Sequence, residues 1–225
     1  MTSEVVRRSA SPVQPLRLAP RCRPDMNNGR LLLLACSEKK AGARGRIPAY
    51  ERYDGPLWQT LRVADPHGTK ATVAFLSARF GFRSACDPIE CYDTRLSKGL
   101  AERMISGGVT ARWPEHAGRA GTMPWGSHAA YEIASLTEYG RRPFRDVALV
   151  GGHLYLEVMR SLVQGFRDIG HVMKNARILE LNDSIGLMRQ RLRAWLDESE
   201  EWSVGHDFAV DAVESLPVVD PSPSS

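Results

Sequence analysis

LLLLACSEKK, residues 31–40, is the stretch from which the rest of the chain is interpreted. Four consecutive leucines are too few to span a membrane and too uniformly apolar for a strand with one face in water. A short apolar run followed by small and polar residues is typical of a strand buried on both faces of a parallel sheet. Its end would lie at the carboxyl edge of the sheet, where open α/β sheets bind ligands. The loop that follows is therefore either the first loop of a site or a solvated, charged turn.

Three further apolar stretches repeat this pattern along the chain. They are ATVAFLS (71–77), DVALV (146–150) and ARILEL (176–181). Segments in which apolar residues recur at helical spacing separate them, so we expect a single α/β domain with a mostly parallel sheet flanked by helices. The first strand is expected at 30–36. A helix should begin near Gly55 and Pro56, because proline is favoured in a first helical turn.

Composition predicts three parts of different character. Residues 1–29 are rich in proline and arginine, which predicts a disordered basic arm. We expect the α/β domain over 30–196, with a glycine- and proline-rich insertion at 107–127. Residues 197–225 contain eight acids and no lysine or arginine, so this acidic tail carries −8 with histidine neutral.

The uneven distribution of charge along the chain indicates which class of partner it binds. Since the whole chain carries +4, the 196 residues before the tail carry +12. A basic body predicts a polyanionic partner, of which nucleic acid is the commonest. The alternative is ordinary surface charge that serves only solubility. The acidic tail would either fold back over the basic face and compete with that partner, or simply be disordered.

Several classes of protein are not supported by the sequence. No apolar run reaches about 18 residues, and the N-terminus lacks the apolar middle of a signal peptide, so we expect no membrane association and a cytoplasmic location. The four cysteines form no CxxC pair and have no histidine at zinc-finger spacing, so no metal is predicted. The glycine-containing loop at 41–53 fits neither the Walker nor the dinucleotide motif, and no cofactor is expected.

Polar side chains at the predicted strand ends are the candidate site residues, since parallel strands end at one edge of the sheet. The candidates for substrate binding are Cys36, Ser37, Lys39, Lys40, Tyr53, Arg79, Tyr92, His153 and Tyr155. The candidate acids are Asp93, Glu90 and Asp183. The structural alternatives are helix caps for Asp93 and Asp183, core packing for the tyrosines, solvated charge for the lysines and a turn for His153. Cys36 is either a nucleophile near Lys39 or a small buried residue that ends a core strand.

The insertion at 107–127 offers a candidate DNA-binding surface. It contains Arg112, Trp113, Arg119 and Trp125 in a segment without periodicity. Large aromatic residues beside arginines in an irregular loop fit base stacking combined with phosphate contact. The alternative is a loop whose tryptophans pack back onto the body of the domain.

Six segments, in this order, carry a resemblance to a known family. They are LLLLACSEKK (31–40), AYERYDGPLWQTLR (49–62), VAFLSARFGF (73–82), IECYD (89–93), VALVGGHLYLEVM (147–159) and LNDSIGLMRQRLRAWL (181–196). Over residues 30–196 the chain resembles the YaaA-like family of uncharacterised bacterial and phage proteins. It is also similar to anti-phage DNA glycosylases that remove glucosylated hydroxymethylcytosine from viral DNA. The insertion and both charged ends depart from the simple family pattern.

The resemblance implies excision of a modified base from phage DNA in antiviral defence. Cleavage of an N-glycosidic bond makes the sugar oxocarbenium-like, and a carboxylate beneath it stabilises that charge or activates water. We expect Asp93 in this role first, with Glu90 and Asp183 next. The base must also leave the stack, and Trp113 is the candidate wedge.

The other candidates would assist this reaction in different ways. Tyr53, Tyr92 and Tyr155 would stack on the flipped base or bond to it, and His153 would donate a proton to it. Lys39, Lys40 and Arg79 would meet phosphate or the departing base. Two alternatives to a DNA glycosylase stay open at this point. One is a DNA-binding protein without activity, and the other is an enzyme that acts on a free modified nucleobase or nucleotide.

Overall fold

The computed structural model describes residues 28–115 and 126–198 and contains a five-stranded sheet in the order β4-β3-β1-β8-β9. Its strands are β1 (Arg30–Ala35), β3 (Thr72–Ser77), β4 (Gly81–Ser84), β8 (Phe144–Val150) and β9 (Val172–Leu181). Four of them are parallel, and β4 alone runs antiparallel, beside β3. The prediction of a mostly parallel α/β sheet flanked by helices is thus confirmed.

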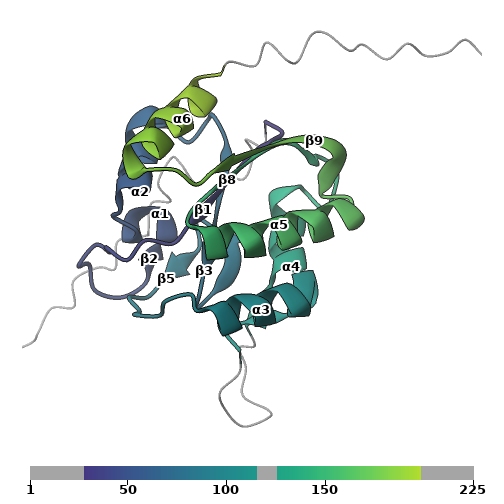
Figure 1. Cartoon of the computed structure of the whole chain (residues 1–225), viewed down its shortest axis with the longest axis horizontal. Helices are drawn as coiled ribbons and strands as arrows, with labels where there is room; N and C mark the ends of the chain where they lie inside the picture. The colour runs from purple at the N-terminus through teal and green to yellow at the C-terminus, as the bar shows by residue number, and fades with distance from the viewer. Residues whose placement is uncertain (1–27, 116–125, 199–225) are drawn as a thin grey trace, which may run out of the picture.

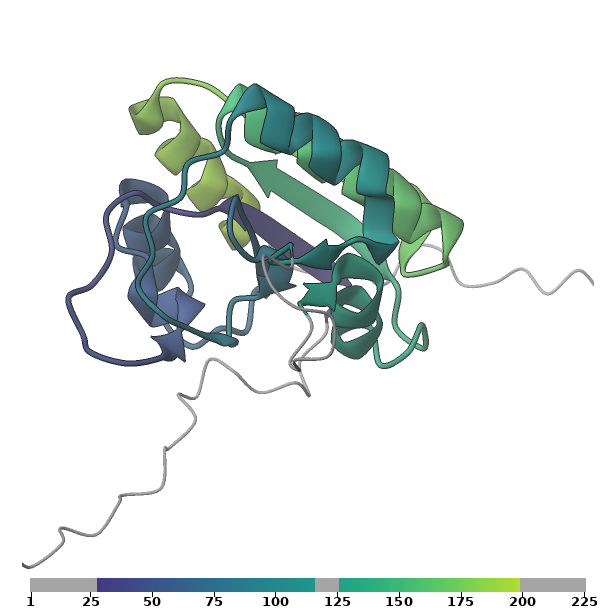
Figure 2. The same ribbon diagram turned by 90° about the horizontal axis from the view of Figure 1, so that it is seen from below.

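Two layers of helices cover the two faces of the sheet (Figure 1). One layer consists of α1 (Ala49–Arg52), α2 (Pro56–Ala64) and α6 (Ile185–Asp197). The other consists of α3 (Lys98–Gly107), α4 (Ala129–Leu136) and α5 (His153–Asp168). Seen after a 90° turn, β1 and β8 run between these layers (Figure 2).

Short pieces complete the described fold. Two small antiparallel pairs join β2 (Ile47–Pro48) to β5 (Pro88–Ile89) and β6 (Arg112–Trp113) to β7 (Ser127–His128). A 3₁₀ helix at Gly108–Thr110 follows α3 directly. Part of the predicted insertion is therefore ordered structure packed beside β4 and α4.

The central strand β1 supplies both cores with leucine side chains. Leu31 and Leu33 belong to the core beneath α3, α4 and α5, whereas Leu32 and Leu34 belong to the core beneath α1, α2 and α6. All four side chains are fully buried. Burial of a leucine side chain contributes about 1.5–3 kcal/mol, so this strand stabilises both layers at once.

Helix starts agree with the sequence signals in part. Pro56 is the first residue of α2 and Gly55 is its N-cap, as predicted. The N-cap of α3 is Ser97, whose hydroxyl accepts a hydrogen bond from the backbone N–H of Leu100, so a capping role for Asp93 is wrong. Ser184 is the N-cap of α6, so Asp183 does not hold that position either.

The N-terminal end of β1 is tied to the end of α6 by a charged cluster. The Arg30 guanidinium lies 4.0 Å from the ring centroid of Trp195 and its Nε is 3.1 Å from Asp146 Oδ2. Trp195 Nε1 donates to Asp146 Oδ1 at 3.2 Å, and Arg177 pairs with the same carboxylate at 3.0 Å. These contacts satisfy a largely buried charge and fix α6 against the sheet.

A second polar cluster lies between the end of β4 and α4. Glu132 is buried, and its Oε1 is 2.6 Å from Nη1 of Arg83. Burial, followed by the negative charge of Glu132, raises the pKa of the Asp87 carboxyl to about 6. Asp87 therefore holds its proton in the folded chain at a pH where the unfolded chain has lost it.

We predict that Leu33→Ala lowers the free energy of unfolding by about 2–5 kcal/mol, because it opens a cavity beneath α3 and α5. The matched control is Val63→Ala, which removes two methyl groups from a side chain that is 73% exposed. The helical spacing of the apolar residues Leu57, Trp58, Leu61 and Val63 predicts that all four face inward, and the exposure of Val63 shows that this is wrong for it. Urea unfolding measures both variants, and a cost at Val63 equal to that at Leu33 would contradict the described core.

We predict that Asp87→Asn stabilises the folded chain at about pH 7.5 relative to wild type. Because the folded pKa of Asp87, about 6, exceeds its ordinary value, the stability of wild type falls as pH rises through the window between them. The asparagine variant loses this dependence, so its advantage should shrink toward about pH 4. Thermal unfolding across this range tests it, with the exposed Asp168→Asn as control. An advantage that does not change with pH would contradict the assignment.

Candidate functional site

The site lies where the connections of the sheet diverge. The chain leaves β1 toward α2 and then β3, whereas it leaves β8 toward α5 on the opposite face and then β9. A parallel sheet of this kind opens a crevice at the carboxyl ends of the two diverging strands. Cys36 follows β1 at this point, and Gly151 and Gly152 follow β8.

Two glycines allow the loops to approach closely here. A Cβ atom on Gly151 would lie 2.8 Å from the Cβ of Ala35, and a Cβ on Gly55 would lie 2.3 Å from the Ser37 hydroxyl. Neither position tolerates a side chain without movement of its neighbour. Gly151, directly after β8, therefore serves close packing of the β1 and β8 ends, whereas a Cβ on Gly152 would meet nothing within 4 Å.

Five polar side chains meet near these strand ends, and we name them the tyrosine cluster: Cys36, Tyr53, Ser77, Tyr92 and Tyr155. Cys36 Sγ is 3.0 Å from the Tyr155 hydroxyl. The Tyr92 hydroxyl is 2.6 Å from that of Tyr53 and 2.8 Å from Ser77 Oγ. Segments that are far apart in the sequence thus bring three phenols, a hydroxyl and a thiol together.

The interior of the cluster is dry. Tyr53 and Ser77 are fully buried and Tyr92 is nearly so. Burial raises the pKa of all three phenols above the ordinary tyrosine value. The next cause is the charge of Cys36 for Tyr92 and Tyr155, and the charge of Tyr92 for Tyr53. The three phenols are therefore neutral hydrogen-bonding groups at neutral pH.

Charged side chains surround the mouth of the cluster. Lys39 pairs with Asp54 at 2.8 Å, and this pairing lowers the pKa of the Asp54 carboxyl. Lys40 Nζ lies 4.5 Å from the ring centroid of Tyr92, a cation–π contact. Further ion pairs join Arg79 to Glu90 and Arg95 to Glu38. Exposed pairs of this kind contribute about 0–1 kcal/mol each, so they can exchange partners with a charged ligand at small cost.

The three candidate acids lie in different surroundings. Glu90 is held by Arg79 at 3.1 Å, and Asp183 is held by Arg191 at 2.6 Å. Asp183 also lies at the end of β9, which β8 separates from β1. Asp93 is exposed, follows Tyr92 directly and takes part in none of the ion pairs among residues 28–115 and 126–198. Of the three, it has the carboxylate that is most available to a substrate or a water.

The remaining substrate-binding candidates divide between the cluster and its surroundings. Ser37 packs against Gly55 beside the cluster. His153 is the first residue of α5, and its side chain is 72% exposed, with Nε2 3.6 Å from Glu157. The imidazole therefore lies outside the dry interior, and Tyr155 is the side chain of this helix that enters the cluster.

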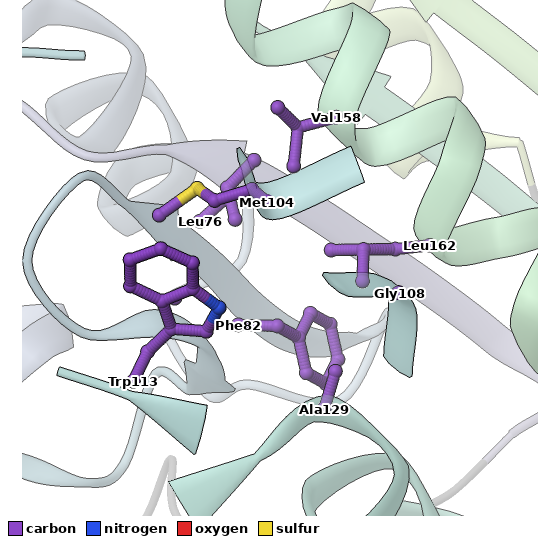
Figure 3. A pocket seen from close by; sticks show the side chains of 9 residues that line it. Leu76, Phe82, Met104, Gly108, Trp113, Ala129, Val158 and Leu162 are labelled. Carbon is purple, nitrogen blue, oxygen red and sulfur yellow. The ribbon is translucent and has the colours of Figure 1, made fainter. Parts of the chain in front are cut away.

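The structure corrects the role expected for Trp113. Its side chain is buried, with 7% of its surface exposed, and it lines an apolar pocket with Leu76, Phe82 and Met104 (Figure 3). A tryptophan packed in this core does not act as a wedge between bases, so the alternative of packing onto the body is the correct one. The close approach requires glycine at position 81, where a Cβ would lie 2.8 Å from Trp113.

Arg112, beside it, is exposed and donates to the backbone carbonyl of Gly126 at 3.0 Å, which closes the base of the β6–β7 pair. Arg119 and Trp125, the other two candidates for DNA binding, lie outside the described residues.

Sequence reasoning missed Ser77 as a member of the site. It is the last residue of β3, and its hydroxyl accepts hydrogen bonds from the backbone N–H groups of Arg79 and Phe80. A polar residue that ends an otherwise apolar buried strand is the signal that could have identified it. The first strand shows the same signal at Cys36.

Comparison with known proteins yields no relative: no family model, no curated protein and no solved structure matches the chain. Within the two described ranges, no helix combines the length and apolar character needed to cross a bilayer. In the same part of the chain, no three histidine, cysteine, aspartate or glutamate side chains are grouped so that they could hold a metal ion.

We predict that Tyr53, Tyr92 and Tyr155 resist ionisation when the pH of the folded protein is raised to about 11, because their pKa values lie above the ordinary value near 10. Absorbance at 295 nm measures phenolate directly.

The same shift has a consequence for stability. The unfolded chain loses its phenolic protons first, so the free energy of unfolding should fall as pH rises above about 10. Tyr131→Phe is the control, since it removes an exposed phenol and leaves the tyrosine cluster intact. Ionisation of all six tyrosines in one step near pH 10, with the circular dichroism of the fold intact, would refute the described burial.

Proposed function

We propose that this chain is a DNA glycosylase that excises a modified nucleobase from phage DNA, with the tyrosine cluster as its base-binding site. The observation that carries the proposal is the meeting of Cys36, Tyr92 and Tyr155 at the diverging strands, with the exposed carboxylate of Asp93 directly after Tyr92. Aromatic hydroxyls beside an available carboxylate supply both recognition of a base and stabilisation of a sugar cation. The resemblance to YaaA-like proteins and to anti-phage glycosylases supports the same assignment.

The charges at the mouth favour a polyanionic substrate. Lys39, Lys40, Arg79 and Arg95 all lie on loops at the carboxyl edge of the sheet. The carboxylate partners of Lys39, Arg79 and Arg95 are exposed or half-buried, and a phosphate can replace the carboxylate in each of these pairs. Backbone phosphates on both sides of a flipped nucleotide would be held in this way.

In the proposed reaction the bond between the sugar C1′ and the base nitrogen breaks, and its electron pair leaves with the base. Asp93 stabilises the cationic sugar or removes a proton from the water that attacks C1′. Glu90 is a second acid at the rim, and its pairing with Arg79 makes it the weaker candidate. This hydrolysis uses water alone as a co-reactant, so it does not require a metal.

A second candidate function is favoured by the tight closure of the cluster. Tyr53 is fully buried and Tyr92 nearly so, and Trp113 does not provide the predicted wedge. An enzyme that acts on a free modified nucleobase or nucleotide would need no wedge and could use the same groups. Turnover of a free nucleoside without DNA would identify this function.

We predict that the purified protein, in the presence of a chelator, releases base from DNA that contains glucosylated hydroxymethylcytosine and not from unmodified DNA of the same sequence. Mass spectrometry detects the released base, and alkaline cleavage detects the abasic site. Asp93→Asn should lower the rate roughly 100-fold or more, the scale of a positioned carboxylate, while DNA binding is retained.

Asp168→Asn is the matched control, because Asp168 is exposed at the far end of α5 and should leave the rate unchanged. Full activity of the Asp93 variant would exclude the assigned role. Salt-sensitive binding to both DNAs without base release would favour a DNA-binding protein without this activity.

A further inference from the structure

The parallel strands begin at the edge of the sheet opposite to the tyrosine cluster, and three exposed cations lie at that edge. Arg141 is in the turn before β8, Arg145 is the second residue of β8, and Lys174 is the third residue of β9. In the part of the chain that the structure describes, none of the three takes part in an ion pair. Glu138, the acid of the same turn, pairs with Arg142 at 3.4 Å. The three cations are therefore available to a negatively charged segment.

The pairing of β8 with β9 brings two of these cations together. The residues before and after Arg145 on β8 pair with Val172 and Arg177 of β9. Arg145 therefore lies opposite residues 173–176, an irregularity of the strand that contains Lys174. A third cation, that of Arg177, follows directly on the same strand.

The turn before β8 also packs against the turn before β9. The Thr137 hydroxyl is 2.7 Å from Nδ1 of His171, and the backbone N–H of Phe144 donates to the carbonyl of His171 at 3.0 Å. The first turn presents Tyr139, which is 76% exposed, and the second leads to Met173, which is 42% exposed. We name this surface the basic edge: Tyr139, Arg141, Arg145, Met173 and Lys174.

The acidic end of α6 reaches the same edge of the sheet. Asp197 Oδ1 is 2.6 Å from Lys70 Nζ, and the Glu198 carboxylate pairs with Arg177. The backbone carbonyl of Glu198 accepts a hydrogen bond of 3.3 Å from Arg30, the first residue of β1. The pairing of tail carboxylates with cations at this edge therefore begins within the structure.

The sequence that follows Glu198 complements the basic edge. Residues 199–225 contain six acids, no lysine or arginine, and the aromatic residues Trp202 and Phe208. An extended chain spans about 3.3–3.6 Å per residue, so this segment reaches up to about 90 Å, more than the width of a domain of this size. Its acids match the cations of the basic edge, and its aromatic residues match the exposed apolar side chains.

We propose that residues 199–225 bind intramolecularly to the basic edge, with their carboxylates at its three cations and their aromatic residues against Tyr139 and Met173. The basic edge lies opposite the tyrosine cluster, so this docking is independent of the proposed reaction. A segment held here screens these cations from other polyanions. A nucleic acid would then meet the cations at the carboxyl edge of the sheet, beside the tyrosine cluster.

Zero-length cross-linking of the full chain tests the proposal, because a carbodiimide joins a lysine only to a carboxylate that contacts it. All five lysines of the chain lie within the described residues. Two are at the edge where the strands begin, Lys70 and Lys174, and three are at the opposite edge, Lys39, Lys40 and Lys98. The chain itself holds the first acids after Glu198 near the basic edge, so the informative acids are the distal ones: Asp207, Asp211 and Glu214.

We expect links from Lys174 to these distal acids. Lys98 is the matched control, since it is also exposed and has no ion pair among the described residues. The pair of Lys70 and Asp197 is the internal standard. A segment that moves freely would reach both edges, so equal yields at Lys174 and Lys98 would overturn the proposal.

A charge reversal tests the electrostatic basis of the docking. Arg141→Glu, with unchanged circular dichroism, should lower the yield at Lys174 roughly tenfold relative to the internal standard, because repulsion replaces attraction. Arg44→Glu, at an exposed position in the loop after β1, should leave the yield unchanged. Salt at about 1 M should also lower the yield, since the Debye length falls to about 3 Å. A yield at Lys174 that neither Arg141→Glu nor salt lowers would refute the docking.

Hydrogen exchange gives a readout that does not depend on lysine chemistry. Amides of residues 169–175 should exchange more slowly in the wild-type chain than in the triple variant Asp207→Asn, Asp211→Asn, Glu214→Gln. Equal exchange in the two chains would contradict the proposed contact.

A mixture of ¹⁵N-labelled and unlabelled chains identifies which copy supplies the segment. Links within chains of one isotope composition support intramolecular docking. Links that join labelled to unlabelled chains would overturn it and indicate that two copies exchange their acidic segments.

Discussion

The structure depends on the burial of β1 on both of its faces. Leu31 and Leu33 face one helical layer while Leu32 and Leu34 face the other, so neither layer can form without this strand. A strand in this position needs parallel neighbours on both sides, and β3 and β8 provide them. The connections after β1 and β8 must then leave toward opposite faces, because each has to build one of the layers. The crevice at Cys36 is a direct consequence of how the hydrophobic core is built.

The hydrogen bonds within the tyrosine cluster follow from the cost of burying polar groups. A buried hydroxyl without a partner costs about 1–3 kcal/mol, so the hydroxyls of Tyr53, Ser77 and Tyr92 are satisfied by one another. Two backbone N–H groups of the turn after β3 donate to Ser77 Oγ, and the hydroxyl of Ser77 in turn donates to that of Tyr92. Cys36, which is half-buried, contacts the Tyr155 hydroxyl through its sulfur.

The sequence predicted the four parallel strands well, because a double-sided apolar run has few alternatives in a domain of this size, but it did not predict the antiparallel β4. It also predicted that Cys36, Tyr92 and Tyr155 share one edge, since parallel strands end together. It could not predict which side chains meet there, and Ser77 was missed. The same limit explains why the predictions for Val63 and Trp113 are wrong. Periodicity gives the spacing of apolar residues but not the neighbour that covers them, and glycine at position 81, which lets Trp113 into the core, lies far from it in the sequence.

The distribution of charge around the tyrosine cluster constrains what it can bind. No acid belongs to the cluster itself, and three acids around it, Asp54, Glu90 and Glu38, are paired with cations. A cationic ligand would meet the protons of phenols inside and lysines outside, an arrangement that repels positive charge. A ligand that has a ring with acceptor atoms at its edge, and a phosphate beside that ring, would meet complementary groups. The phenols of the cluster would face the ring, and the lysines around the cluster would face the phosphate. Asp93 is exposed and follows Tyr92 directly in the chain, so under the proposed function it is the carboxylate assigned to the sugar of the bound nucleotide.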